Sequence, residues 1–538
     1  MKKIILMILL FVNFIYTQVL DEKLYITIQM MDQIGIINTE SNQIQETIPT
    51  ELSNEENQIS CMDFDNEMVC NMTDGCEWMM GMCMENSLED CMDYSIEMEC
   101  SMNSNCMWMN NHCMDSSDSC MDVNNEMMCN MTDGCEWMMD MCMESMNTSD
   151  INTPHFIVMD EELGYWFVTT IASGYVSQYS LIDNQLIDYH FVGDAPAILT
   201  IDTINKKIYC SRMMPMNGMG SMMPESESNI IQALDYSPMG LSESTISEYE
   251  IGSPAPHGLT INHDGTEIYT ASNTTDWLYK INTVTGDILG AVMDTLINNP
   301  PNQTIQRLKP IQCLYHKFSS YDIERLFVSC SGGSWYNPFN GETTVVPGAL
   351  QMWNPNTMEL LDTIEFGNYT GPWHIATSPI DNIIYIALSG DNLYETEGLA
   401  AVSFDIDNNL ELEWISSNPS FDTFHGIDVS SNGEYIYVSG RGDGYIHIFN
   451  NNGIYLDNIY TGGMSMLGGI CITKAGIPNL GDSNNDGIIN VIDIVKIVNY
   501  IIGNTMIFSP YEIYSSDLTL DSIINVSDIV NIINIIID

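Results

Sequence analysis

Between residues 151 and 478, apolar and polar residues alternate in short segments that are separated by Asn, Asp and Gly. The clearest example is 253–290, in which LTI, EIYTAS, DWLYKI and DILGAV are separated by short polar turns. Alternation with a period of two is typical of half-buried antiparallel strands. A sheet of about four such strands is marginal alone and must pack against neighbours. We therefore expect this segment to be one unit of a repeat.

The unit recurs in a consistent register. Pro256–His257 lies eleven residues before the EIYTAS strand, and the same offset holds for Pro154–His155, Pro196–Ala197 and Phe424–His425. Trp373–His374 precedes its strand by ten residues, and a looser fit places Gln312 in the series. This makes six full units and one lone strand, LGGICIT at 467–473. Further strands with no nearby partner occur in 22–50.

The pieces at the two ends of the chain complete a seventh unit. Closing a ring from both termini removes exposed sheet edges, as in β-propellers. We predict a mainly β fold: a seven-bladed β-propeller over 151–478, with 22–50 supplying strands of the last blade. The segments HGLTINHDGTEIYTASN and HGIDVSSNGEYIYVSGRGDGYIHIFN resemble the YVTN/lactonase-like and quinoprotein-like propellers. Such a resemblance predicts the fold and says little about activity.

Charge and the N-terminus indicate the compartment. The 73 acidic residues against 14 Lys and Arg give a formal net charge of −59, which argues against binding nucleic acid or an anionic membrane. Residues 1–18, with Lys2 and Lys3 before an apolar run, have the pattern of a secretory signal peptide, and the short, Lys-led form is typical of bacteria. We expect a secreted or cell-surface protein without a membrane span after signal cleavage.

Residues 61–146 differ from the rest in composition. Three copies of C-x8-C-x5-C-x6-C begin at Cys61, Cys91 and Cys120, and residues 61–142 hold twelve of the 16 cysteines and half of the 40 methionines. Units this small need covalent support, so we predict two disulfides per repeat in this small insertion, with the pairing left open. The methionines are either fillers of small cores and adhesive surfaces or ligands for copper, which thioethers favour.

Residues 480–538 contain two segments with the spacing of calcium loops. In such a loop, side chains at positions 1, 3, 5, 9 and 12 and the carbonyl at position 7 surround one ion with oxygen. The predicted calcium ligands of the first loop are Asp482, Asn484, Asp486, Ile488, Asn490 and Asp493. Those of the second loop are Asp517, Thr519, Asp521, Ile523, Asn525 and Asp528. Thr519 and Ser522 stand where Asn or Asp and Gly are usual.

The tandem loops, each ending in I-N-x-x-D, resemble a type I dockerin, a pair of calcium-loop–helix units. The resemblance implies an all-α, EF-hand-like module that binds calcium and docks on a cohesin-like protein, a pairing best known from polysaccharide-degrading complexes. The apolar helix after each loop is expected either to pack on its twin or to keep one face for a partner. Calcium bound only for folding, with no cohesin partner, is the alternative.

Four histidines share one position in the repeat: His155, His257, His374 and His425. First strands line the channel of a propeller, so these side chains are expected to form an incomplete ring at one mouth. A ring of imidazoles can bind a transition metal, copper in particular, as in propellers of the nitrous-oxide-reductase type. The alternative is a structural residue that every repeat encodes.

We therefore expect a binding or display protein whose propeller recognises a protein or carbohydrate ligand and whose C-terminal module attaches it. The alternative is a propeller enzyme, namely a polysaccharide-active hydrolase, a lactonase or a copper oxidoreductase. No G-x-S-x-G nucleophile motif is present, so an enzyme is the less favoured interpretation. Among the remaining cysteines, Cys313 and Cys330 are expected on adjacent strands, where they could pair.

Overall fold

The computed structural model describes residues 22–50, 152–193, 195–213, 229–297, 299–318, 323–391, 394–462, 466–474, 479–503 and 507–537, and the backbone of six short strands between 76 and 144. The chain separates into two compact units, of which one joins Met1–Thr50 to Asn152–Asp538 and the other is Glu51–Ile151. The signal peptide predicted for 1–18 lies outside the described residues.

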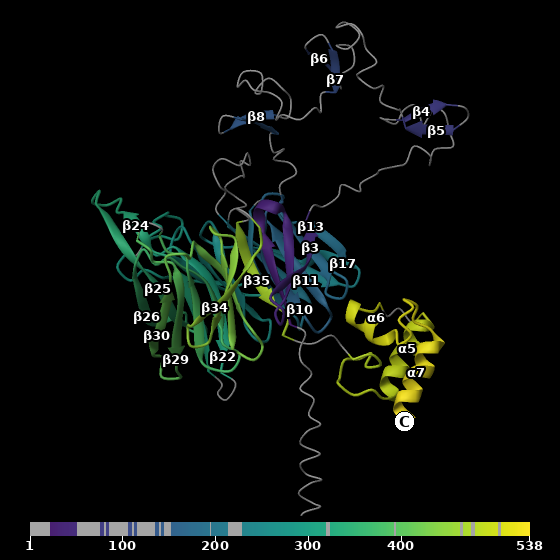
Figure 1. The fold of residues 1–538 in the computed structure, drawn as a ribbon. Coiled ribbons are helices and arrows are strands. Elements are labelled where there is room, and N and C mark those ends of the chain that lie inside the picture. Colours follow the sequence, from purple (N-terminus) through teal and green to yellow (C-terminus); the bar gives the residue numbers. More distant parts are fainter. Residues whose placement is uncertain are drawn as a thin grey trace, which may run out of the picture. The chain divides into compact units, whose positions relative to one another are not determined.

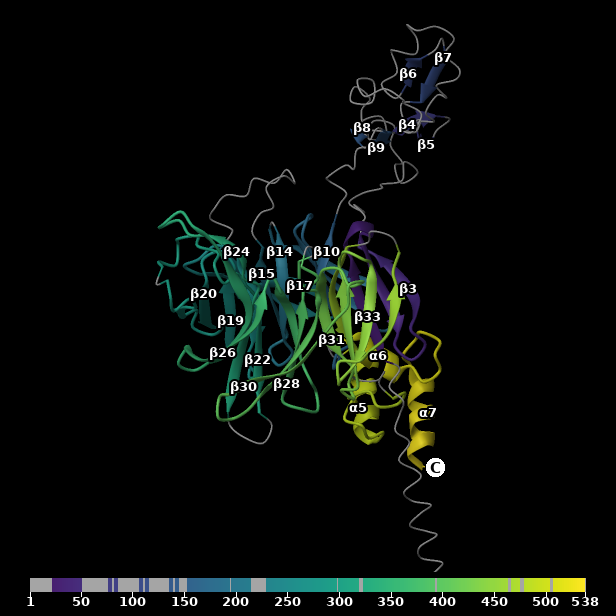
Figure 2. The ribbon, with the colours of Figure 1, turned by 60° about the vertical axis from the view of Figure 1, so that its left-hand side comes forward.

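Seven antiparallel sheets form the blades of a propeller (Figure 1; Figure 2). Blade 1 contains β10 (Pro154–Asp160), β11 (Tyr165–Thr170), β12 (Tyr175–Ser180) and β13 (Leu186–Phe191). Blade 2 contains β14 (Pro196–Asp202), β15 (Lys207–Arg212), β16 (Ile230–Ser237) and β17 (Gly240–Glu250). Blade 3 contains β18 (Pro256–Ile261), β19 (Glu267–Ser272), β20 (Trp277–Asn282) and β21 (Ile288–Val292).

The next three blades follow the same order along the chain. Blade 4 contains β22 (Pro310–Lys317), β23 (Glu324–Cys330), β25 (Thr343–Asn354) and β26 (Glu359–Asn368), and β24 (Gly333–Tyr336) pairs with the extended start of β25. Blade 5 contains β27 (Pro372–Thr377), β28 (Ile383–Leu388), β29 (Gly398–Phe404) and β30 (Leu410–Ser417). Blade 6 contains β31 (Phe424–Val429), β32 (Tyr435–Gly440), β33 (Tyr445–Asn450) and β34 (Tyr455–Tyr460).

Blade 7 is built from both ends of the propeller sequence, which confirms the predicted closure. Its first strand is β35 (Leu467–Ile472), and the other three are β1 (Lys23–Ile28), β2 (Gln33–Asn38) and β3 (Gln43–Pro49), with the 3-10 turn η1 (Gln29–Met31) after β1. β35 pairs antiparallel with β1. The backbone N–H of Thr473 donates to the carbonyl of Lys23 over 2.9 Å. The ring therefore closes by non-covalent pairing of strands more than 400 residues apart.

Burial follows the order of strands within a blade. The second strands β11 and β15 are almost entirely buried, whereas the fourth strands β3 and β13 are largely exposed. Apolar residues of neighbouring blades meet in shared clusters, for example Leu24 and Ile26 of blade 7 with Tyr437 and Ile448 of blade 6. The core therefore lies between blades, which explains why a single blade would not be stable alone.

Unit Glu51–Ile151 contains three two-stranded hairpins of equal size. They are β4 (Cys76–Met79) with β5 (Met82–Glu85), β6 (Cys106–Met109) with β7 (His112–Asp115), and β8 (Cys135–Met138) with β9 (Met141–Glu144). Each hairpin holds the third and fourth cysteine of one sequence repeat. The predicted disulfides and the role of the methionines concern side chains outside the described residues.

The C-terminal segment forms three helices within the described residues: α5 (Val491–Ile501), α6 (Pro510–Ser516) and α7 (Val526–Ile537). No helix in the described part of the chain is long and apolar enough to cross a membrane. The pairing considered for Cys313 and Cys330 is wrong, because both are free buried thiols. They lie on paired strands, but Cys330 stands opposite Pro310 and Cys313 opposite Val328.

Candidate functional site

Each blade begins with the same local backbone structure at the propeller axis. A residue with left-handed backbone precedes every first strand: Thr153, Ala195, Ala255, Lys309, Gly371, Thr423 and Met466, with φ between 46° and 54°. Pro follows it in five of the seven blades, and a β-bulge interrupts the first strand directly afterwards in blades 1 to 6. Neighbouring first strands contact one another around the ring. The bulge therefore lies at the axis, at the same end of each blade.

The four histidines lie together at this end, as the repeat register predicts. The ring of His155 lies 6.5 Å from that of His257, 6.4 Å from that of His374 and 5.6 Å from that of His425. The rings of His374 and His425 are 4.6 Å apart. All four side chains are buried, with at most 3 % of their surface exposed. We name these four residues the axial histidine cluster.

Burial keeps the imidazoles of this cluster neutral. It lowers the pKa of His374 to about 3, with further lowering by His257 and Arg441. Burial likewise lowers the pKa of His155, His257 and His425. The guanidinium of Arg441 adds to the lowering at His155 and His425. The charged group that acts on the cluster is therefore a cation.

The hydrogen bonds of the cluster leave several ring nitrogens without a partner. Nδ1 of His257 lies 2.6 Å from the carbonyl oxygen of Ile311 and donates to it, whereas Nδ1 of His155 contacts Nε2 of Gln29 at 3.0 Å. Within the described residues, Nε2 of His155, Nε2 of His374 and Nδ1 of His425 are buried and have no hydrogen-bond partner. Unpaired buried polar groups are uncommon and each calls for an explanation.

Three neighbours of the cluster were not found from the sequence. Gln29 belongs to η1, which follows the distant strand β1. Arg441 follows β32, and its backbone N–H donates to the carbonyl of Thr423 at the start of blade 6. The Trp373 ring lies 5.4 Å from that of His425. Gln312 is the third residue after the left-handed Lys309, as His374 is after Gly371, which agrees with its predicted place in the series. Ile311 stands at the second position, which His257 has after Ala255.

The transition-metal prediction for His155, His257, His374 and His425 stays a prediction. Their imidazoles are close enough to share a ligand, and unpartnered neutral nitrogens are what metal binding needs. Among the described residues, no group of three or more His, Cys, Asp or Glu side chains stands in a metal-holding arrangement. A bound cation would also face the Arg441 guanidinium. The fit to a metal is thus partial.

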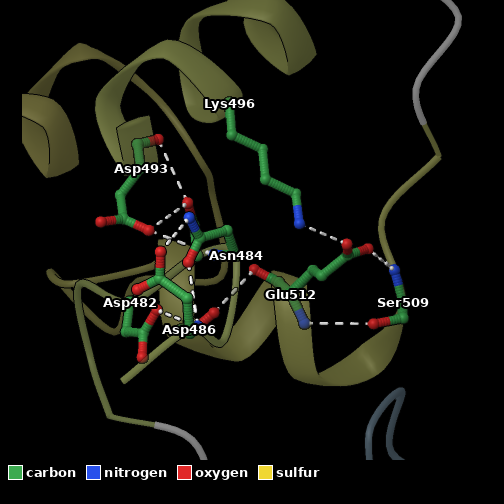
Figure 3. Close-up of polar contacts among 9 residues, drawn as sticks. Asp482, Asn484, Asp486, Asp493, Lys496, Ser509 and Glu512 are labelled. Carbon is green, nitrogen blue, oxygen red and sulfur yellow. Dashed lines mark hydrogen bonds and ion pairs between the residues drawn. The ribbon is translucent and has the colours of Figure 1, made fainter. Parts of the chain in front are cut away.

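The first candidate calcium loop, 482–493, is wound around its acidic side chains (Figure 3). The carboxylate of Asp482 accepts the N–H of Asp486 at 3.1 Å and that of Gly487 at 2.8 Å. Oδ1 of Asp493 accepts the N–H of Asn484, and its Oδ2 accepts the N–H of Asn490. The side chain of Asn490 caps α5, and Asp493 completes the capping box. The loop and helix are therefore held by the residues predicted as ligands.

The second candidate loop, 517–528, repeats this hydrogen-bond pattern 35 residues later. Asp517 accepts the N–H of Asp521 at 3.2 Å and that of Ser522 at 2.7 Å. Asp528 accepts the N–H of Thr519 and of Asn525 at 3.0 and 2.8 Å. The hydroxyl of Thr519 also donates to Asp528. The two loops therefore have one conformation, although position 3 differs.

The residues of both loops fit a hard cation. Asp482, Asp493 and Asp528 are at most 1 % exposed, and Asp517 is 7 % exposed. Their recorded partners are N–H and hydroxyl groups, not cationic side chains. The nearby Lys496 instead pairs with Glu512 at 2.5 Å (Figure 3). Buried carboxylates without a positive partner are costly, and an oxygen-liganded cation such as calcium would remove that cost.

The two helices after the loops expose matching apolar side chains. Val495 of α5 is 53 % exposed and its counterpart Val530 of α7 is 50 % exposed. The same match holds for Val491 with Val526, Val498 with Ile533, and Ile501 with Ile536. Ile497 and Ile532 are instead fully buried, where α5 contacts α7. Each helix thus packs one face on its twin and leaves an apolar stripe exposed. The predicted packing of the helices on each other is confirmed, and a partner for the exposed stripe stays a prediction.

A hollow lies at the end of three axial strands opposite the histidine cluster. It has a volume of about 360 Å³ and is lined mainly by residues at the ends of β14, β18 and β22, including Asp202, His263 and Lys317. Polar atoms dominate this lining. It is a further surface of the propeller on which a polar ligand could rest.

Comparisons with known proteins give distant structural similarities and no match in sequence. No protein-family model matches the chain, and no curated protein matches its sequence. Hydrazine synthase from Kuenenia stuttgartiensis is similar at 9% identity and a TM-score of 0.44, over 60% of this chain and 95% of that one. A candidate 6-phosphogluconolactonase from Bacteroides uniformis has 12% identity and a TM-score of 0.43, over 60% and 88%.

Virginiamycin B lyase from Staphylococcus aureus has 16% identity and a TM-score of 0.41, over 60% of this chain and 89% of that one. At these identities and scores no activity is carried over to this chain. What the chain does must be argued from its own sites.

Proposed function

We propose that this chain is a secreted or cell-surface binding protein whose C-terminal module is a dockerin-like, calcium-dependent attachment device. The observation that carries this proposal is the identical hydrogen-bond pattern of the two loops, both wound around buried carboxylates without a positive partner. Calcium would be held by the side chains at positions 1, 3, 5, 9 and 12 and by the carbonyls of Ile488 and Ile523. The ion would supply the charge that the buried carboxylates lack.

The duplicated apolar stripe supports a protein partner for this module. Val495, Val498, Val530 and Ile533 are exposed at spacings that place them on one face of each helix. A face of β-branched residues without charge suits the apolar centre of a protein interface better than a carbohydrate. A cohesin-like protein is the occupant that the resemblance to dockerins implies. The propeller would then present its own ligand, a protein or carbohydrate, away from this attachment.

Calcium binding by the full-length protein tests the first half of the proposal. After removal of divalent ions, isothermal titration should show two calcium ions per chain. Asp493→Asn and Asp528→Asn should each lose one ion, because each removes a buried carboxylate from one loop. Asp405→Asn, in an exposed propeller turn, is the matched control and should still bind two. Absence of calcium uptake in the unmodified chain would refute the proposal.

Binding of a recombinant type I cohesin module tests attachment separately. The double variant Val495→Lys, Val530→Lys should lose cohesin binding and keep both calcium ions, because neither side chain belongs to a loop. The tryptophan fluorescence of the chain reports on regions before residue 479, since 479–538 contains no Trp. An unchanged fluorescence spectrum would show that the propeller is intact. Calcium uptake without cohesin binding by the unmodified chain would leave only a structural role for calcium.

A further inference from the structure

The axial histidine cluster has neighbours that can only donate hydrogen bonds and lack an acceptor. Nη1 of Arg441 and Nε1 of Trp373 are buried and unpartnered within the described residues. Guanidinium and indole N–H groups have no acceptor capacity. A metal ion would satisfy the imidazole lone pairs but would leave both of these donors unpaired. An acceptor is what this part of the cluster needs.

The position of Arg441 brings a positive charge to the histidines. Its backbone N–H bonds to Thr423, two residues before His425, so its chain position is at the same end of blade 6. Burial lowers the pKa of Arg441, and no carboxylate among the described residues raises it. In contrast, the partly buried Arg307 pairs with Asp294 at 3.0 Å. A buried cation without a counter-charge is costly, and a bound anion would offset that cost.

The neutral imidazoles can also serve an anion. A neutral imidazole has one N–H to donate, and three ring nitrogens of the cluster are buried without a partner. The ring centroids are 4.6 to 6.5 Å apart, as in rings that contact one another, so a ligand beside the cluster can have only a few atoms. The Phe156 ring lies 5.4 Å from that of His374 and adds an apolar wall. The surroundings therefore combine one charge, several N–H donors and an apolar side.

We propose that the axial histidine cluster, together with Arg441 and Trp373, binds a small carboxylate. One guanidinium balances one negative charge, so a monoanion is favoured over a dianion such as sulfate, which would leave a net charge buried. Arg441 would form the charge-assisted hydrogen bond, and Trp373 and the imidazoles would donate to the same ligand. This inference is independent of the C-terminal module.

Acetate is the probe for this site. The full chain, freed of transition metals and supplied with calcium chloride, should show a saturable rise in Tm as sodium acetate increases, since a ligand that binds only the folded state stabilises it. Sodium sulfate should give no saturable component. Arg441→Gln should weaken acetate binding about tenfold or more, which corresponds to one lost charge-assisted hydrogen bond. Arg441→Lys should retain part of the affinity.

Two further variants control for a general effect of charge and for misfolding of Arg441→Gln. Lys207→Gln removes the same charge at an ion pair with Asp235 outside the described sites and should leave the acetate response unchanged. Trp373→Phe keeps the ring and removes only the N–H, so a weaker acetate response in this variant supports the site even if Arg441→Gln fails to fold. An equal acetate response in the unmodified chain, Arg441→Gln and Trp373→Phe would overturn the proposal. Stoichiometric copper uptake that requires His374 and His425, with no acetate response, would overturn it in favour of the metal site.

Discussion

Ser522 of the second candidate loop adopts a left-handed backbone, with φ of 65°, at the position where Gly487 of the first loop has φ of 82°. Both residues donate their N–H to the first aspartate of their loop, at 2.7 and 2.8 Å. The left-handed region costs an ordinary L-residue about 1–2 kcal/mol and costs glycine almost nothing. The second loop therefore keeps the turn of the first under backbone strain.

Replacing this serine should strengthen the second loop. Ser522→Gly is expected to raise its calcium affinity by about three- to tenfold, because a strain of about 1 kcal/mol is relieved. Isothermal titration in the Asp493→Asn background would measure this loop alone.

The reverse change is the matched control. Gly487→Ser in the Asp528→Asn background should weaken the first loop by a similar factor. A Cβ atom at Gly487 would meet no heavy atom within 4 Å, so any effect comes from the backbone and not from a clash. Equal affinities for serine and glycine at both positions would contradict the strain argument.

The blades could be predicted from the sequence because each blade carries its own residues for the turn that precedes its axial strand. The Pro–His pairs at Pro154, Pro256 and similar positions mark the residue after the left-handed turn, and the strand pattern follows. The offset of ten before β28 has a local explanation. His374 is the third residue after the left-handed Gly371, whereas His425 is the second after Thr423, and the bulge in each first strand accommodates both.

The surroundings of the histidines could not be predicted, because they depend on contacts between blades. Gln29 reaches His155 only after β1 pairs with β35, from the other end of the chain. Arg441 carries a weak signal, since it directly follows YIYVSG where the other units have Ile171, Met213, Asn273, Ser331 and Ser389. A lone charge in an otherwise uncharged repeat position was the clue available in the sequence.

Closure by blade 7 predicts that a core residue of β1 supports the whole propeller. Ile26 is fully buried between β35 and β2, where it lies opposite Ile470 and Gly35. Ile26→Ala should lower the free energy of unfolding by about 2–5 kcal/mol, because glycine cannot fill the cavity that remains. Ile44→Ala, on the exposed outer strand β3, should cost under about 1 kcal/mol. Urea unfolding followed by tryptophan fluorescence would check this, and equal costs would show that the propeller does not depend on its closure.

Asp276 holds the long connection between blades 3 and 4. Its carboxylate accepts the N–H groups of Arg307, Leu308 and Lys309, each at 2.9 Å, while its own backbone is left-handed with φ of 56°. Asn tolerates this backbone, so Asp276→Asn tests the acceptors alone. This substitution should lower the free energy of unfolding by about 2 kcal/mol or more, because the buried NH₂ group of the asparagine would then face three backbone N–H donors. Asp405→Asn, in an exposed turn, should lower the free energy of unfolding by less, since water replaces the acceptor there. Urea unfolding of the two variants would measure both changes.

The buried histidines predict a loss of stability in acid. The pKa of His374 is about 3 in the folded chain against 6.5 in the unfolded chain, so the unfolded state binds the proton first. Its contribution is therefore complete above pH 6.5 and is lost as the pH falls toward the folded value. This residue alone should remove about 2 kcal/mol between pH 6.5 and 5.

His374→Gln should flatten this pH dependence in the metal-free protein, measured by Tm in carboxylate-free buffers. Glutamine keeps a polar group in the cluster but cannot take up the proton, so the slope falls even if the variant is less stable at every pH. His263→Gln, in an exposed turn, is the matched control and should leave the slope unchanged. Acetate should also reduce the slope in the unmodified chain, because a bound anion favours a charged imidazole and raises the folded pKa. A slope that neither His374→Gln nor acetate changes would mean that the cluster does not govern acid stability.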